Sequence, residues 1–262
     1  MNRVKEHLEF VQSKGYEIVY IALQGSQNYG VDVYDKDYKS DVDTKAIVLP
    51  TFEDFVKGKE PTSETLILDN NEHCDIKDIR VMFKTFEKQN INFIEILFSD
   101  YYIINPKYEK EFREILDNNE RIAHYNQKQA VKCMAGMSKE KLCALTHPYP
   151  SIIDKINKFG YDGKQLHHIV RLNQFIKKYC SNKSYKECLK ADNVKFLIDL
   201  KKCKLSLEEA KEMATKYDED TNNYKNEVID TLPEADNTCI ELLNKAKYLI
   251  LEKWFKEQLL KK

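Results

Sequence analysis

Hydrophobic and polar positions divide the chain into a first part of mixed helices and strands and a second part of helices only. Residues 2–14 carry apolar side chains at helical spacing and stop at Gly15, which predicts an opening helix. The run 16–23 is β-branched, aromatic and almost wholly apolar, and it is shorter than a typical helix, so it predicts a buried strand. Residues 41–49 predict a second strand, which ends at Pro50.

Further elements complete one predicted sheet. Residues 64–68 and 73–79 have strand character and are joined by an Asp-Asn-Asn turn. Thr51, followed three residues later by Asp54, predicts the start of a short helix. From residue 79 to residue 98 the apolar spacing is helical. Helices and strands that alternate in this way predict an α+β domain, a mixed sheet with flanking helices.

After Pro106 the spacing is helical throughout and predicts no strand. Capping boxes at Ser184, Ser206 and Thr238 mark three expected helix starts, and the charged stretch 218–237 is expected to be a loop. The predicted helices cover residues 109–119, 126–146, 151–159, 163–179, 184–203, 206–217 and 238–261.

The pattern therefore predicts two domains, residues 1–106 with the sheet and residues 107–262 all helical. They differ in charge: the first has 12 basic and 19 acidic residues, and the second has 30 basic and 24 acidic residues. This asymmetry favours a site for cations beside a surface for anions. The charged N-terminus, the absence of an apolar run of about 20 residues, and seven scattered cysteines without a CxxC pair predict a cytoplasmic protein without a membrane partner.

Candidate chemistry is concentrated between residues 23 and 49. Gly25-Ser26 follows a predicted buried strand, where a glycine allows close approach to a ligand and a serine hydroxyl can bond a phosphate oxygen. Asp41 and Asp43 lie two apart on the next predicted strand, so their carboxylates share one face with Lys45. Two such carboxylates repel each other unless a divalent cation lies between them. The apolar residues Val42, Ala46 and Val48 are expected on the opposite face.

A second group of polar residues lies on the predicted helix 163–179. Lys164, His168 and Arg171 are spaced i, i+4 and i+7, which places them in one stripe along the helix. A cationic stripe can bind phosphate oxygens. Spacing alone also fits a solvated helix face, and this alternative stays open.

Together these motifs resemble the signature of the DNA polymerase β-like nucleotidyltransferases. More narrowly, they are similar to a bacterial and phage branch that includes RNA-ligase-associated nucleotidyltransferases. The first set of matching residues is Gly25, Ser26, Tyr29, Gly30, Ser40, Asp41 and Asp43. The second set, a Tyr-Asp-x-Lys-x-x-x-His-x-x-Arg segment, is Tyr161, Asp162, Lys164, His168 and Arg171.

The resemblance implies a polymerase β-like sheet and a metal-dependent catalytic site. It implies that Asp41, Asp43 and a third carboxylate hold two Mg²⁺ ions, or Mn²⁺, and carry the catalysis. Asp75 on the next predicted strand is preferred as the third, where it would help to deprotonate the attacking hydroxyl; Asp78 is the rival, although its place beside a helix start suits capping. The resemblance assigns substrate binding to Gly25, Ser26, Tyr29, Lys164, His168 and Arg171.

The implied activity is the transfer of a nucleoside monophosphate from a nucleoside triphosphate, such as ATP, to an acceptor hydroxyl. RNA-ligase association in the branch favours an RNA end as the acceptor, either a tRNA or a broken RNA. Two alternatives remain: nucleotidylation of a protein or small molecule, and a non-catalytic module that only binds a nucleotide.

Overall fold

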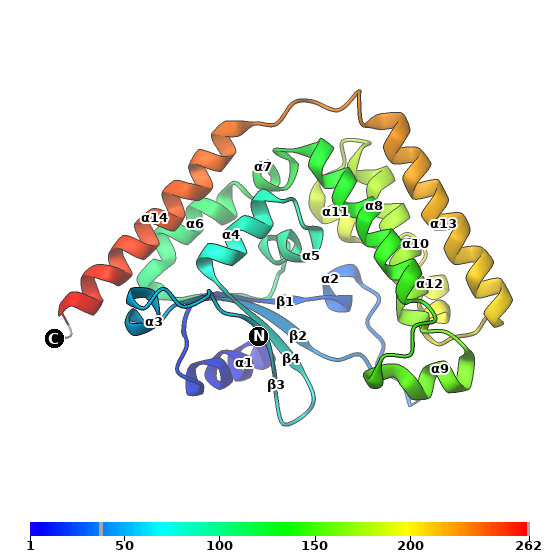
Figure 1. Cartoon of the computed structure of the whole chain (residues 1–262), viewed down its shortest axis with the longest axis horizontal. Coiled ribbons are helices and arrows are strands. Elements are labelled where there is room, and N and C mark those ends of the chain that lie inside the picture. Colours follow the sequence, from blue (N-terminus) through cyan, green and yellow to red (C-terminus); the bar gives the residue numbers. More distant parts are fainter. Residues whose placement is uncertain (37–38, 261–262) are drawn as a thin grey trace. The chain divides into compact units, whose positions relative to one another are not determined.

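The computed structural model describes residues 1–36 and 39–260 of the chain. It has an α+β architecture, with a mixed five-stranded sheet and its helices in the N-terminal part, followed by a largely helical region (Figure 1). The residues group into two compact units. Unit 1 comprises Met1–Asn28, Asp41–Asn126 and Ala235–Lys262, and unit 2 comprises Tyr29–Ser40 and Gln127–Glu234. The sequence boundary at residue 106 falls within unit 1.

The sheet of unit 1 has the strand order β3-β4-β2-β1-β5. All neighbouring strands are antiparallel except β2 and β4, which run parallel. The first four strands confirm the predicted ones, whereas β5 was not predicted because three residues are too few to show a periodicity. The strands are β1 (Glu17–Gln24), β2 (Asp43–Leu49), β3 (Ser63–Ile67), β4 (His73–Asp78) and β5 (Tyr102–Ile104).

Helices cover both faces of this sheet (Figure 1). Helix α1 (Asn2–Ser13) packs Val4 and Val11 against a buried cluster that includes Ala46, Val48 and Cys74, which confirms the predicted apolar face of β2. The predicted helical stretch 79–98 covers the other face as three short pieces. These are α4 (Ile79–Glu87), α5 (Ile91–Ile94) and the 3-10 turn η1 (Glu95–Phe98).

The remaining elements of unit 1 include the last helix of the chain. Helix α14 (Asn237–Leu260) packs against α6 and α4, and its buried Trp254 ring lies 5.7 Å from the Phe55 ring of α3. The helix was predicted, but residue 261 lies outside the described residues. Thr238 does not cap it, because Asp236 accepts the Thr238 backbone N–H. The other elements are α3 (Phe52–Val56, capped by Thr51), η2 (Pro106–Tyr108), α6 (Glu109–Asp117) and α7 (Asn119–His124). Helix α2 (Ser26–Tyr29) begins in unit 1 and ends at Tyr29, the first residue of unit 2.

Unit 2 is a helical bundle in which α10 is packed by α8, α11, α12 and α13. The capping boxes at Ser184 and Ser206 are confirmed. The predicted helix 184–203 is wrong as a single element, because the backbone is extended at Lys190 and Asn193 starts a new helix. The helices are α8 (Gln127–Ala144), α9 (Ile153–Phe159, after the turn η3, Pro150–Ile152), α10 (Gly163–Tyr179), α11 (Tyr185–Leu189), α12 (Val194–Lys201) and α13 (Leu207–Val228).

The expected loop at 218–237 is also corrected, because α13 continues to Val228. Its polar residues Asp218 and Thr221 are buried, and the Ser138 hydroxyl of α8 donates to Asp218 at 2.7 Å. A helix with polar residues on its inner face lacks the apolar period by which it would be recognised. No helix in the described part of the chain combines the length and apolarity needed to span a bilayer.

Candidate functional site

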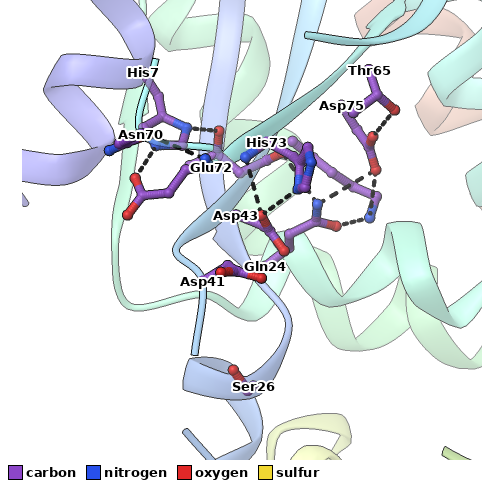
Figure 2. A network of polar contacts seen from close by, with 12 residues as sticks. His7, Gln24, Ser26, Asp41, Asp43, Thr65, Asn70, Glu72, His73 and Asp75 are labelled. Carbon is purple, nitrogen blue, oxygen red and sulfur yellow. Dashed lines mark hydrogen bonds and ion pairs between the residues drawn. The ribbon is translucent and has the colours of Figure 1, made fainter. Parts of the chain in front are cut away.

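Three candidate segments of unit 1 meet at one end of the sheet. Strand β1 ends at Gln24, directly beside Asp43 at the start of the antiparallel β2. Strand β4 runs parallel to β2, with Asp75 opposite Lys45. Because directly paired residues share a face, Gln24, Asp43, Lys45 and Asp75 lie on the same side of the sheet. The register therefore brings the Gly-Ser turn and both strand carboxylates together (Figure 2).

Asp43 is anchored to the neighbouring strand. Its Oδ1 accepts the backbone N–H of His73 at 3.1 Å and lies 3.3 Å from Nδ1 of the same residue. The carboxylate is about a quarter exposed, so it stays open to solvent on one side. Figure 2 shows Asp41 next to Asp43, between Asp43 and Ser26. Asp41 differs from its predicted position, since it precedes the strand and is exposed.

Asp75 pairs with a buried lysine. The Lys45 ammonium lies 3.6 Å from Oδ2 of Asp75 and also donates to Gln24. Thr65 of the edge strand β3 donates to the other carboxylate oxygen at 2.5 Å. Burial lowers the pKa of Lys45 to about 8, and the negative charge of Asp75 opposes that shift. Lys45 was predicted on this face, but its pairing with Asp75 depends on the β2–β4 register.

A hollow of about 250 Å³ opens beside Asp75. The ring of Phe93 lies below both Lys45 and Lys77, whose ammonium groups are 4.8 and 5.0 Å from its centroid. Hydroxyl, carboxylate, ammonium and aromatic groups line the hollow, so it can receive a polar group of limited size. The lining residues are Ser63, Glu64, Thr65, Asp75, Lys77 and Phe93.

The Gly-Ser turn is held by a residue without an assigned role in the sequence. Gly25 adopts a φ of +86°, a conformation that favours glycine, and its backbone N–H donates to the buried Glu95 carboxylate at 2.9 Å. This N–H is therefore engaged within the protein. Ser26 follows at the start of α2, and its hydroxyl lies at the site end of the sheet (Figure 2). Glu95 lies in the stretch 79–98 that the apolar spacing predicts as helical, and that spacing gives no sign of its contact with Gly25.

Asp78 has a structural role. Its side chain accepts the Arg80 backbone N–H at 2.8 Å as the N-cap of α4, and it also pairs with the Arg80 guanidinium. The carboxylate is buried with these partners. The capping role that the sequence favoured for Asp78 is confirmed, and Asp75 is left as the candidate third carboxylate.

The chemistry of the carboxylates fits a hard divalent cation such as Mg²⁺, which prefers oxygen ligands. Asp41 and Asp43 supply such donors, and neither is engaged by a lysine or arginine in the described ion pairs. Within residues 1–36 and 39–260, however, no three His, Cys, Asp or Glu side chains are grouped as a metal centre. Asp75 is instead held by Lys45 and Thr65.

The Tyr-Asp part of the second motif supports the helices of unit 2. Tyr161 is fully buried, and its hydroxyl bonds both polar backbone groups of Leu205. Asp162 caps α10 by accepting the Lys164 backbone N–H at 3.0 Å. Both residues therefore fix the start of α10 in place, and the remaining polar residues of the motif are the cationic ones.

The predicted cationic stripe is only partly exposed. Lys164 is exposed, but Arg171 is 3% exposed, and its guanidinium stacks on the Tyr29 ring at 3.7 Å from the centroid. The alternative of a solvated face is therefore wrong for Arg171. Burial first, and then the charges of His167, Arg171, Lys164 and Lys141, lower the pKa of His168 well below its usual value. His168 is consequently neutral at pH 7.

Sequence reasoning missed a further cation beside this stripe. Lys201, the last residue of α12, is 8% exposed, and its ammonium donates to the Val31 carbonyl oxygen at 3.0 Å. Val31 belongs to the segment Tyr29–Ser40, which also bonds α11–α12 through the Tyr29 carbonyl and Ala191. The sequence gives no signal for Lys201, because charged residues at helix ends are ordinarily solvated.

Comparisons with models of known protein families and with curated proteins give no match to this chain.

Proposed function

We propose that this chain is a metal-dependent nucleotidyltransferase of the DNA polymerase β-like type, which transfers a nucleoside monophosphate from a nucleoside triphosphate to an acceptor hydroxyl. The observation that carries the proposal is the strand register. It collects Gly25-Ser26, Asp43 and Asp75 at one end of one sheet, although 50 residues of sequence separate the first from the last. A sheet that served only as a scaffold would need no such convergence.

In this proposal the candidate site residues of unit 1 have separate roles. Asp41 and Asp43 would hold Mg²⁺ with Asp75 as the third carboxylate, and the ion when bound supplies charge neutralisation and activation of the attacking oxygen. Ser26 offers a hydroxyl to a phosphate oxygen, on a turn that Glu95 keeps in position. Asp75 borders the hollow with Lys77 and Phe93, so an acceptor hydroxyl placed there lies next to a carboxylate that can accept its proton.

The cations of unit 2 supply a second kind of contact. Lys164 is exposed, and Arg171 is oriented by Tyr29, so both are suited to phosphate oxygens. His168 is neutral and offers a hydrogen bond without a charge. An RNA end is the proposed acceptor, on the motif resemblance; a protein or small-molecule hydroxyl is the competing acceptor class.

The test is a transfer assay with each labelled nucleoside triphosphate and with Mg²⁺ or Mn²⁺. The acceptors are RNA with a free 3′-hydroxyl, the same RNA with a 3′-phosphate, and the protein alone. Label in the hydroxyl-ended RNA, dependent on metal and absent with the blocked end, is the expected result. Nucleotide binding without transfer to any acceptor would favour the non-catalytic module.

A further inference from the structure

The cations of unit 2 gather where α10 begins and α12 ends. Gly163, the first residue of α10, has no side chain, and a Cβ there would lie 2.2 Å from the Leu200 carbonyl oxygen and 3.0 Å from that of Lys201. The backbones of the two helices are therefore in direct contact at this point. This contact places Lys201 beside the cationic face of α10, although 37 residues separate Lys201 from Lys164 in sequence.

The charges that meet there have the same sign. Burial lowers the pKa of Lys201 to about 8, and the nearby charges of Lys164 and Arg171 lower it further, while Asp32 acts in the opposite direction. Burial also lowers the pKa of His167, and Lys201, Arg171 and Lys164 add to that shift. Buried cations that repel one another destabilise a fold unless an anion compensates them.

His167 gives an independent sign of a ligand. It is 1% exposed, and neither of its ring nitrogens has a hydrogen-bond partner within the part of the chain that the structure describes. Buried polar side-chain atoms are nearly always hydrogen-bonded. An imidazole that is neutral at pH 7 carries one N–H, which can donate to an anion. The Tyr29 ring stacks on the Arg171 guanidinium and orients it.

We propose that Arg171, Lys201 and His167 form a polyphosphate-binding site within unit 2, with Lys164 at its exposed edge. The inference rests on the proposed function in one respect, that the natural ligand is the triphosphate tail of a nucleotide. The binding itself needs neither metal, base nor acceptor, because the recognised groups are the phosphate oxygens. Lys201 and His167 thereby gain a role that the motif resemblance does not assign to them.

The experiment is a calorimetric titration of the full-length protein with inorganic tripolyphosphate at pH 7, without divalent metal. Lys201→Met removes the charge and keeps an unbranched side chain of similar length. Lys202→Met is the matched control, because the neighbouring Lys202 pairs with Asp35. We expect Lys201→Met to raise the dissociation constant about tenfold or more, since a charge-assisted contact is lost, and Lys202→Met to leave it within about twofold. Lys201→Arg should retain binding.

Equal affinities for wild type, Lys201→Met and Lys202→Met would overturn the proposal, as would no binding of tripolyphosphate by the wild type. Should Lys201→Met fail to fold, the folded Lys201→Arg and His167→Phe proteins decide, with binding kept in the first and weakened in the second. ATP should bind at least as tightly as tripolyphosphate and AMP more weakly; equal binding of AMP and ATP would show that the base, and not the phosphates, is recognised. The Asp41→Asn/Asp43→Asn protein should bind tripolyphosphate normally, so a failure of nucleotidyl transfer is distinguishable from a failure of this site.

Discussion

At the sheet end of unit 1 the buried charge of Lys45 lies beside an opposite charge, whereas in unit 2 the buried cations Arg171 and Lys201 lie beside each other. Lys45 has a carboxylate, an amide and an aromatic ring around its ammonium. His167, between cations, has no hydrogen-bond partner among the described residues. Lys45 therefore has an opposite charge beside it, whereas the cations of unit 2 meet beside an imidazole whose hydrogen-bonding capacity an anion can satisfy. The comparison predicts an anion at the second place and not at the first.

The largest effect is expected at the carboxylates that are not paired with a lysine or arginine. Asp41→Asn/Asp43→Asn should lower nucleotidyl transfer by about a thousandfold or more, since several kcal/mol of transition-state stabilisation depend on the bound metal. The asparagine at position 43 still offers an oxygen to the His73 N–H, so the thermal midpoint should change little. Transfer rates and melting curves are measured together. Asp69→Asn, at an exposed turn, is the control; full transfer by the double variant would refute the proposed mechanism.

Gly163→Ala tests the contact that gathers the cations. The new Cβ would collide with the Leu200 carbonyl oxygen, so α10 and α12 must separate, at a cost of about 1–3 kcal/mol in the free energy of unfolding. Gly136→Ala is the matched control on α8, because nothing lies within 4 Å of its Cβ position, and it should stabilise by up to about 1 kcal/mol. Urea titration measures both variants. Equal stabilities would show that the close contact is absent in solution.

The Lys45–Asp75 pair should respond unequally to the loss of its two members. Asp75→Ala leaves Lys45 buried without its carboxylate and should cost about 1–2 kcal/mol, a value reduced for the partial exposure of Asp75. Lys45→Met removes the buried charge and should change the free energy of unfolding by less than about 1 kcal/mol. Chemical denaturation of both variants and of the double variant measures the coupling. A larger loss for Lys45→Met would contradict this account of the pair.

The smallest predicted effect is the pH dependence of tripolyphosphate binding. In the free protein the Lys201 pKa is about 8, so Lys201 loses its proton between pH 7 and pH 9, while a bound anion favours the charged form. Affinity should therefore fall as pH rises, by up to about tenfold at pH 9. His167 and His168 are neutral across this range and Arg171 stays charged, so they add no slope. In Lys201→Met this fall in affinity should be absent, and calorimetry of both proteins at both pH values tests this.

Local patterns predicted the parts of this protein that depend on near neighbours in the chain. The strands β1 to β4, the N-caps at Thr51, Ser184 and Ser206, and the apolar face of β2 all follow from residue type and spacing, because these features form within a few residues. The capping role of Asp78 was visible for the same reason. Polar helix faces were not predicted. The stretch 218–237 is expected from the sequence to be a loop, yet α13 continues to Val228 with buried contacts that are polar.

By itself the sequence determined the kinds of residue in each candidate site: carboxylates after the Gly-Ser turn, and cations on α10. Only the tertiary structure determined which groups these residues contact. The β2–β4 register places Lys45 opposite Asp75, the fold brings Glu95 to the Gly25 N–H, and the α10–α12 contact at Gly163 adds Lys201 to the cations. Each of these contacts joins segments at least 30 residues apart. Charge pairing acts through space, so no pattern along the chain could have shown them.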